Sequence, residues 1–299
     1  MNELEQLEAM LRARPASLSN DQRRAAYDAL GDRFPLAADV HVEPVQAHGV
    51  PAEWTSTPVA GTSEVILYLH GGGYAWGSLK SHRHLVSELG RAARMRTLAL
   101  GYRLAPEYPF PQALEDAVSG FQFLLDVGLQ PRQIMVAGDS AGAGLAVALL
   151  VRLKELGMRQ PACALLFSPW ADMTATADSY HRNAKRDPVL NRSIMQFLAE
   201  QYLGKRPRET PLASPVFADL SGIAPLTIFV GSTEALLDDA IALTRAAGLA
   251  DVSVRLEIWP KMFHIWPNYH PVLAQGRQGI ARAGRLLREA AQTASGSEA

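Results

Sequence analysis

The stretch Gly138-Asp139-Ser140-Ala141-Gly142-Ala143-Gly144 lies between a strand-like run, residues 134–137, and an apolar run, residues 145–151, that is typical of a helix. G-x-S-x-G between a strand and a helix is a nucleophile elbow, a turn so sharp that the serine adopts a strained backbone conformation. The neighbouring chain passes close by, so the flanking residues must be small, and here they are glycine and alanine. The stretch predicts that Ser140 projects its hydroxyl above a sheet and acts as a nucleophile.

The composition of the 299-residue chain is globular, with 48% apolar and 20% charged residues. A formal net charge of −1 gives no drive toward nucleic acid or an anionic membrane, so we expect neither as a partner. The first residues lack the pattern of a signal peptide, and no apolar run approaches the roughly 18 residues that indicate a membrane span. We therefore expect a cytoplasmic protein. The single cysteine, Cys163, lies in an apolar run typical of a buried strand, and it excludes an internal disulfide.

Short strand-like runs alternate with helix-like segments along most of the chain. Residues 65–69 are continuously apolar, as expected of a strand buried on both faces. The other runs are residues 40–45, 52–56, 97–101, 134–137, 164–167, 226–230 and 252–258, with helical segments such as 114–125 and 236–247 between most of them. This alternation predicts an α/β fold with a mostly parallel central sheet flanked by helices.

Two regions break the alternation. The first 34 residues have apolar side chains at helical spacing, and the segment between Trp170 and Pro215 contains no strand but a helical pattern at residues 194–202. We predict that about residues 1–36 and 177–212 form a helical cap over the carboxyl ends of the strands, within a single domain spanning residues 1–299. Apolar and aromatic residues of the cap, Phe34, Phe197 and Tyr202, indicate a closed apolar pocket. The last helix is expected over residues 271–291, with a frayed tail beyond it.

A serine nucleophile needs hydrogen-bond donors for the developing oxyanion. The sequence His70-Gly71-Gly72-Gly73 follows the apolar run that ends at residue 69. Consecutive glycines let backbone N–H groups turn toward a substrate oxygen without an intervening side chain. We predict that Gly71, Gly72 and Ala141 donate to the oxyanion, with His70 and Gly73 in support.

Among eight histidines, His264 has the position expected of the general base. It follows the last predicted strand, in a loop that would reach the carboxyl edge of the sheet. His270 is the fallback. His82 and His84 have the spacing of a metal-binding pair, but no third ligand accompanies them, and we expect a solvated helix start. We predict neither a metal site nor a cofactor.

The acid that orients the base should follow the preceding strand, residues 226–230, because the α/β-hydrolase order is nucleophile, acid, histidine. Three carboxylates lie in that loop, Glu234, Asp238 and Asp239. Some of them are expected only to stabilise the start of a helix, whose dipole favours acidic residues there. Spacing from the end of the strand favours Glu234 as the catalytic acid, and Asp238 is the alternative. Asp139, beside the nucleophile, is expected to be a buried hydrogen-bonding anchor.

Together these segments resemble the bacterial hormone-sensitive-lipase family of esterases, and the resemblance covers nearly the whole chain. The matching motifs, in order, are His70-Gly71-Gly72-Gly73; Tyr102-Arg103-Leu104-Ala105-Pro106-Glu107 with Pro109 and Pro111; Gly138-Asp139-Ser140-Ala141-Gly142; Ser168-Pro169-Trp170; and the His264 loop. The resemblance implies an α/β-hydrolase fold and a serine carboxylesterase in which Ser140 is the nucleophile, His264 the base and Glu234 its orienter. It also implies that Arg103 and Glu107 brace the loop beside the site rather than touch substrate.

The acid loop departs from the family pattern. Many members carry aspartate followed by proline and leucine, where this chain has Glu234-Ala235-Leu236, which leaves the identity of the acid less secure. Ala143 replaces a second glycine at the end of the elbow. Glu53-Trp54 with Arg186-Asp187-Pro188 resembles the branch that includes monoterpene lactone hydrolases and short-chain carboxylesterases.

The expected partner is a small-molecule ester with a short or medium acyl chain. A lactone hydrolase or an amidase is the alternative, because the same triad can open either bond. A non-catalytic small-molecule receptor on the same fold is the alternative of another class, and the presence of His264 argues against it. If residues 252–258 form an exposed edge strand, a homodimer could form by pairing it across a two-fold axis.

Overall fold

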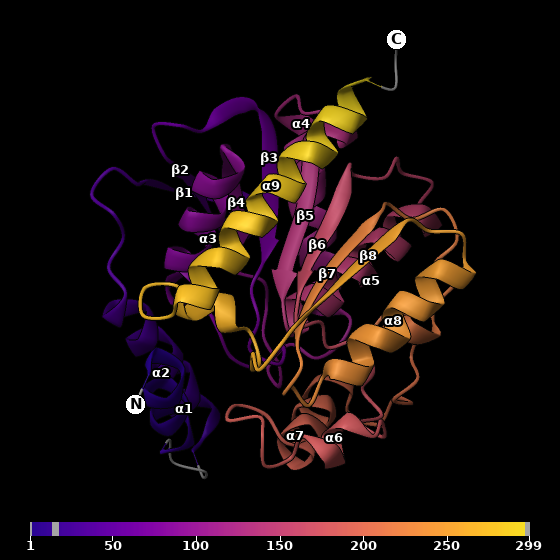
Figure 1. Cartoon of the computed structure of the whole chain (residues 1–299). Coiled ribbons are helices and arrows are strands. Elements are labelled where there is room, and N and C mark those ends of the chain that lie inside the picture. The colour runs from indigo at the N-terminus through magenta and orange to yellow at the C-terminus, as the bar shows by residue number, and fades with distance from the viewer. Residues whose placement is uncertain (1, 14–17, 297–299) are drawn as a thin grey trace.

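The computed structural model describes residues 2–13 and 18–296, and an eight-stranded sheet forms its centre (Figure 1). The strands are β1 (His41–Ala47), β2 (Val50–Ser56), β3 (Gly61–Leu69), β4 (Met95–Leu100), β5 (Ile134–Asp139), β6 (Cys163–Phe167), β7 (Leu226–Gly231) and β8 (Val254–Trp259). Their spatial order is β1-β2-β4-β3-β5-β6-β7-β8. The pairs β1–β2 and β2–β4 are antiparallel, and every pair from β4 to β8 is parallel. The predicted α/β fold with a mostly parallel sheet is confirmed.

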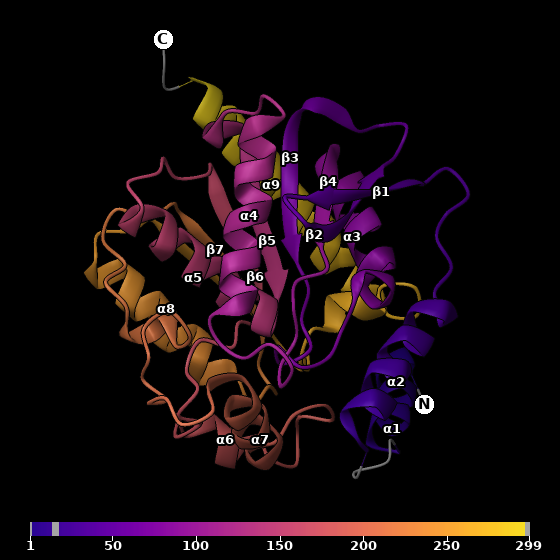
Figure 2. The same cartoon turned by 180° about the vertical axis from the view of Figure 1, so that it is seen from behind.

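Helices cover both faces of this sheet, with α3 and α9 on one face and α4 and α5 on the other (Figures 1 and 2). The helices are α1 (Glu3–Arg12), α2 (Asn20–Arg33), α3 (Leu79–Ala93), α4 (Gln112–Asp126), α5 (Ala141–Glu155), α6 (Ser179–Arg182), α7 (Arg192–Leu203), α8 (Leu237–Leu249) and α9 (Ala274–Gly296). Short 3-10 turns lie at Pro131–Gln133, Pro215–Phe217 and Trp266–Tyr269. The last helix is longer than predicted, because its alanine-rich end continues the helix to Gly296.

The central strands are buried because apolar side chains cover both of their faces. On β3, Ile66 and Tyr68 pack into the core beneath α3 and α9, while Leu67 and Leu69 pack into the core beneath α4 and α5. All four side chains are fully buried. This alternation is the period of two that a strand imposes, and it explains why the run is continuously apolar. The end of β3 is thereby fixed beside the end of β5, which pairs with it in parallel register.

The helices outside the sheet layers, α1, α2, α6 and α7, lie at the end of the molecule where the parallel strands end (Figure 1). Side-chain caps define three of their starts, from Asn2 for α1, Ser19 for α2 and Asn191 for α7. Helix α7 forms where the pattern predicts it, and its buried residues are Met195, Leu198, Ala199, Tyr202 and Leu203. Leu198 and Tyr202 are buried, whereas Phe197 is 43% exposed. Phe197 therefore does not contribute to a closed pocket.

Candidate active site

Ser140 lies at the turn between β5 and α5, with φ 54° and ψ −120°, a conformation that non-glycine residues rarely adopt. A Cβ atom on Gly142 would lie 2.0 Å from the carbonyl oxygen of Leu69, and one on Gly138 would lie 2.5 Å from the carbonyl oxygen of Gly142. Both glycines are required because β3 passes so close to the turn. The elbow thus holds the Ser140 hydroxyl at the carboxyl end of β5, where 6% of the residue remains exposed.

Three side chains from separate loops form a continuous hydrogen-bonded chain at this hydroxyl. His264 Nε2 lies 2.9 Å from Ser140 Oγ, and His264 Nδ1 lies 3.1 Å from Glu234 Oε2. Glu234 is fully buried, and His264 is 2% exposed. With the Nδ1 proton directed at the carboxylate, Nε2 is free to accept the serine proton. This arrangement can activate the Ser140 hydroxyl as a nucleophile in a largely buried site.

The structure separates the carboxylates that compete in sequence for the role of the acid. Asp238 Oδ2 accepts the backbone N–H of Ser179 at 2.7 Å, and Asp239 Oδ2 accepts the N–H groups of Ala171 and Asp172. Both belong to α8. They bind the backbone of α6 and of the loop after β6 rather than the imidazole of His264. Glu234 precedes the helix and is the carboxylate that reaches His264.

Ser168 is a functional candidate that the sequence analysis did not single out. Its hydroxyl donates to Glu234 Oε1 at 2.8 Å and accepts the backbone N–H of Ile265 at 3.0 Å. The N–H of Gly231 also donates to Glu234 Oε1, at 2.5 Å. Ser168 therefore links the acid to the residue after the base. Its signal was the Ser-Pro-Trp motif, which identifies a family without assigning a role.

The glycine loop places its donors differently from the prediction. The N–H of Gly71 donates to Asp139 Oδ1 at 3.0 Å, so this donor is not directed at a substrate, and its assignment to the oxyanion hole is wrong. Gly72 and Gly73 have φ values of 113° and 63°, in the region that favours glycine. Within the described chain, the N–H groups of Gly72, Gly73 and Ala141 donate to no recorded acceptor. These three, rather than Gly71, are the candidate oxyanion donors.

Several known proteins are similar to this chain in sequence and in structure. The family of the alpha/beta hydrolase fold matches residues 66–268. An acetyl-hydrolase of Streptomyces hygroscopicus is 46% identical over 270 residues, covering 90% of each chain, and an esterase of Acinetobacter venetianus is 34% identical over 267 residues, covering 89% of this chain and 88% of the other. The crystal structure of an esterase from the bacterial hormone-sensitive lipase family has a TM-score of 0.94 at 45% identity and covers 97% of this chain and 98% of that one. The chain belongs to the bacterial hormone-sensitive lipase family of esterases. The resemblance found in the sequence is confirmed, and the protein is a carboxylic ester hydrolase.

In this esterase a buried polar network supports the glycine loop from below. Asp139 Oδ1 accepts the Tyr68 hydroxyl at 2.7 Å in addition to the N–H of Gly71, and its Oδ2 lies 3.3 Å from His82 Nε2. Burial alone would raise the pKa of Asp139, but His82 and Tyr68 outweigh it and hold the pKa below the usual value. Asp139 therefore has the buried, hydrogen-bonded surroundings expected of an anchor.

The prediction that His82 and His84 are solvated is wrong. They are 2% and 3% exposed, because α3 is covered by both α2 and α9. His84 Nε2 lies 2.9 Å from the carbonyl oxygen of Asn268, and burial lowers the pKa of His84 to about 4. His270, the fallback base, stacks on His84 with ring centroids 5.6 Å apart, and the hydrogen bond to Ser140 comes from His264 instead.

Arg103 and Glu107 lie beside the site and bond protein groups. The Arg103 guanidinium grips Asp116, with the closest pair of atoms 2.7 Å apart. Glu107 accepts two hydrogen bonds from Arg24 of α2, which also donates to the carbonyl oxygen of Ala75. Through Arg24, the N-terminal helix is thus attached to the segment that follows the glycine loop.

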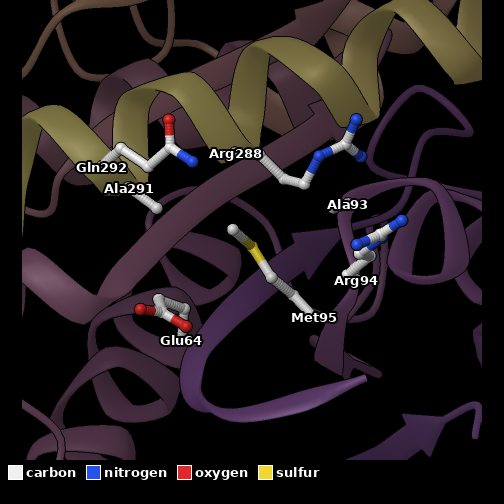
Figure 3. Close-up of a pocket in the computed structure, with 7 residues that line it drawn as sticks. All are labelled: Glu64, Ala93, Arg94, Met95, Arg288, Ala291 and Gln292. Carbon is white, nitrogen blue, oxygen red and sulfur yellow. The ribbon is translucent and has the colours of Figure 1, made fainter. Parts of the chain in front are cut away.

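One groove lies far from this chemistry. It encloses about 540 Å³ at the amino ends of β3 and β4, beneath α9, whereas Ser140 lies at a carboxyl end (Figure 3). Its lining residues are Glu64, Ala93, Arg94, Met95, Arg288, Ala291 and Gln292. None of them belongs to the triad or the glycine loop.

A second pocket, of about 310 Å³, adjoins the His264 loop. Tyr27 and Leu30 of α2 line one side, and Val189, Ile265 and Tyr269 line the other. The pocket therefore lies between the N-terminal helices and the residue next to the base. Its position makes it a candidate binding space for part of a substrate.

Over residues 2–13 and 18–296, no three His, Cys, Asp or Glu side chains are grouped so that they could hold a metal ion. Within the same residues, no helix has the length and apolar character needed to cross a bilayer. Neither result bears on the triad.

Proposed function

We propose that this esterase hydrolyses short- to medium-chain acyl esters through an acyl-enzyme formed on Ser140. The observation that carries the proposal is the continuous series of hydrogen bonds from Ser140 through His264 to Glu234. Beside it lie three backbone N–H groups that donate to no protein acceptor among the described residues. A buried carboxylate, an imidazole in hydrogen-bond contact with it and a strained serine are the components that acyl transfer requires.

In the first half-reaction, His264 Nε2 removes the Ser140 proton as Oγ attacks the ester carbonyl carbon. The negative charge that develops on the carbonyl oxygen is stabilised by the N–H groups of Gly72, Gly73 and Ala141. The imidazolium, stabilised by Glu234, then donates its proton to the departing alkoxide. In the second half-reaction, His264 activates a water molecule, which attacks the acyl carbon and releases the acid and the Ser140 hydroxyl.

The preference for short and medium acyl chains is supported by the contacts of α7 with the glycine loop. A Cβ atom on Gly73 would lie 2.5 Å from Leu198 Cδ1, so this cap leucine packs directly on the loop. Tyr202, one turn further along α7, stacks on Tyr74 with centroids 3.8 Å apart. We accordingly propose that α1, α2, α6 and α7 form a cap that restricts the acyl space.

The test is hydrolysis of p-nitrophenyl butyrate by the wild type and by Ser140→Ala, together with labelling by a fluorophosphonate probe. The wild type should turn over the ester and be labelled on Ser140, whereas the variant should do neither. Activity retained in Ser140→Ala would refute the mechanism, and a wild type that is neither active nor labelled would indicate a receptor. A panel of matched ester, lactone and amide would decide between an esterase, a lactonase and an amidase.

The proposed homodimer is a separate expectation. Strand β8 lies at the edge of the sheet, and Ile258 on it is 44% exposed. An unpaired edge can pair with a second copy across a two-fold axis. Light scattering at several protein concentrations would test this, and a monomer at all of them would refute it.

A further inference from the structure

One short segment of the cap bonds the loop that carries Glu234. Ser179 Oγ donates to the carbonyl oxygen of Ala235 at 2.6 Å. The side-chain amide of Asn183 donates to the carbonyl oxygen of Glu234 at 2.7 Å. Both Ser179 and Asn183 are fully buried. The backbone of the acid loop is therefore fixed by cap residues as well as by the sheet.

Asp187, in the same segment, binds the acid loop as a hydrogen-bond acceptor, whereas Ser179 and Asn183 bind it as donors. It is 5% exposed, and its Oδ2 accepts the N–H of Ala235, the residue directly after Glu234, at 2.8 Å. Its Oδ1 accepts the N–H groups of Val189 and Leu190, at 2.8 and 3.1 Å. Among the described residues, no lysine or arginine forms an ion pair with it. The structure thus contains a further buried carboxylate beside Glu234, held by backbone donors.

The charges that act on this carboxylate come from the catalytic site. Burial raises the pKa of Asp187 to about 6, a positive charge on His264 opposes that rise, and Glu234 adds to it. The phenol of Tyr180 in α6 is also close enough to respond to Asp187. His264 therefore has two carboxylates within electrostatic range, Glu234 in hydrogen-bond contact and Asp187 beyond it.

We infer that Asp187 is a positioning residue for the catalytic triad, which holds the backbone next to Glu234 and adds negative charge that favours the protonated form of His264. The inference rests on the proposed function, because the imidazolium forms only if His264 is the base. Three backbone donors keep the carboxylate in place, so its charge reaches the imidazole without reorganisation. The cap then supplies part of the electrostatic environment of the triad in addition to covering the substrate.

The experiment compares four full-length proteins: the wild type, Asp187→Asn, Asp187→Glu and Ser179→Ala. Asp187→Asn removes the charge, and Asp187→Glu keeps the charge but moves the carboxylate, on a longer side chain, away from the N–H of Ala235. Ser179→Ala removes a neighbouring hydrogen bond to the same loop and serves as the structural control. For each we would measure kcat and KM for p-nitrophenyl butyrate and the pH profiles of kcat/KM and of fluorophosphonate labelling.

We expect Asp187→Asn to lower kcat roughly tenfold with little change in KM, because the acid loop shifts relative to His264. The midpoint of the acidic limb should move to lower pH by about half a unit, because removing a nearby negative charge disfavours the imidazolium. Asp187→Glu and Ser179→Ala should lower kcat without this shift. An unchanged midpoint in Asp187→Asn, or an equal shift in Ser179→Ala, would overturn the electrostatic role.

Two further results keep the outcomes separate. If Asp187→Asn does not fold, as judged by circular dichroism, Asp187→Glu tests the positioning role alone, and a wild-type kcat in that variant would overturn it. A wild type that lacks esterase activity would refute the proposed function itself. An active wild type with unaffected variants would refute only the inference about Asp187.

Discussion

Two sides of the site converge on Ser140, and they are stabilised in different ways. The glycine side, residues 70–73, rests on Asp139, Tyr68 and His82, which belong to central strands and to α3. The acid side, residues 231–239, is bonded by Ser168 after β6 and by residues 179–187, which comprise α6 and the segment after it. The glycine side depends on the packing of the sheet core, whereas the acid side depends on the segment between β6 and β7. Substitutions on the two sides should therefore have different effects.

The largest effect is expected on the acid side. Glu234→Gln removes the charge that stabilises the imidazolium and should lower kcat for p-nitrophenyl butyrate by roughly 10³- to 10⁴-fold. Asp238→Asn is the matched control, since Asp238 lies in the first turn of α8 and accepts the N–H of Ser179 rather than contacting His264. Its kcat should change only a few-fold. The reverse ranking of these two variants would assign the acid to Asp238.

On the glycine side, Gly72→Ala should lower kcat by roughly 10²-fold, the order of magnitude for loss of an oxyanion donor. The added Cβ atom would lie 2.3 Å from the carbonyl oxygen of Trp76, and φ is 113°, so the backbone must move. Gly49→Ala is the control, because Gly49 also has a positive φ but no atom within 4 Å of the added carbon. It should affect stability and leave kcat intact. Equal loss of kcat in both variants would show that any strained glycine matters, whatever its place.

At the cap, the expected change is in specificity. Leu198→Ala removes the side chain that packs on Gly73 and should move the preferred p-nitrophenyl ester toward longer acyl chains, with kcat/KM for those esters rising several-fold. Phe197→Ala on the same helix is the control, because that side chain is 43% exposed. If both variants kept the wild-type chain-length profile, α7 would not limit the acyl space.

The same contrast explains what could be predicted from sequence. The nucleophile elbow and the glycine loop each depend on residues close together in the chain, such as Gly138 and Gly142 around Ser140. The same is true of the strands after which the acid and the histidine follow. The direction of the Gly71 N–H could not be predicted, because it depends on Asp139, 68 residues away. The burial of His82 and His84 was missed for a similar reason: α2 and α9, at opposite ends of the sequence, pack against α3 and exclude water from it. On the acid side, spacing favoured Glu234, but the support from Ser168 and Asp187 arises only from tertiary contacts.

The smallest effect concerns the packing of α3 against the segment that follows His264, and it should appear in stability alone. The pKa of His84 is lowered to about 4 by burial, against about 6.5 in an unfolded chain. Between these values the unfolded state binds the proton more readily, so the free energy of unfolding falls as the pH decreases from about 6.5 to 4, by at most about 1.4 kcal/mol per pH unit for this group. His84→Gln keeps a donor for the carbonyl of Asn268 but cannot titrate, so its urea midpoint should fall less steeply over this range. His41→Gln, at an exposed histidine of β1, should keep the wild-type slope. A wild-type slope in His84→Gln would mean that other groups account for the acid sensitivity. One such group is His70, whose pKa burial also lowers to about 4.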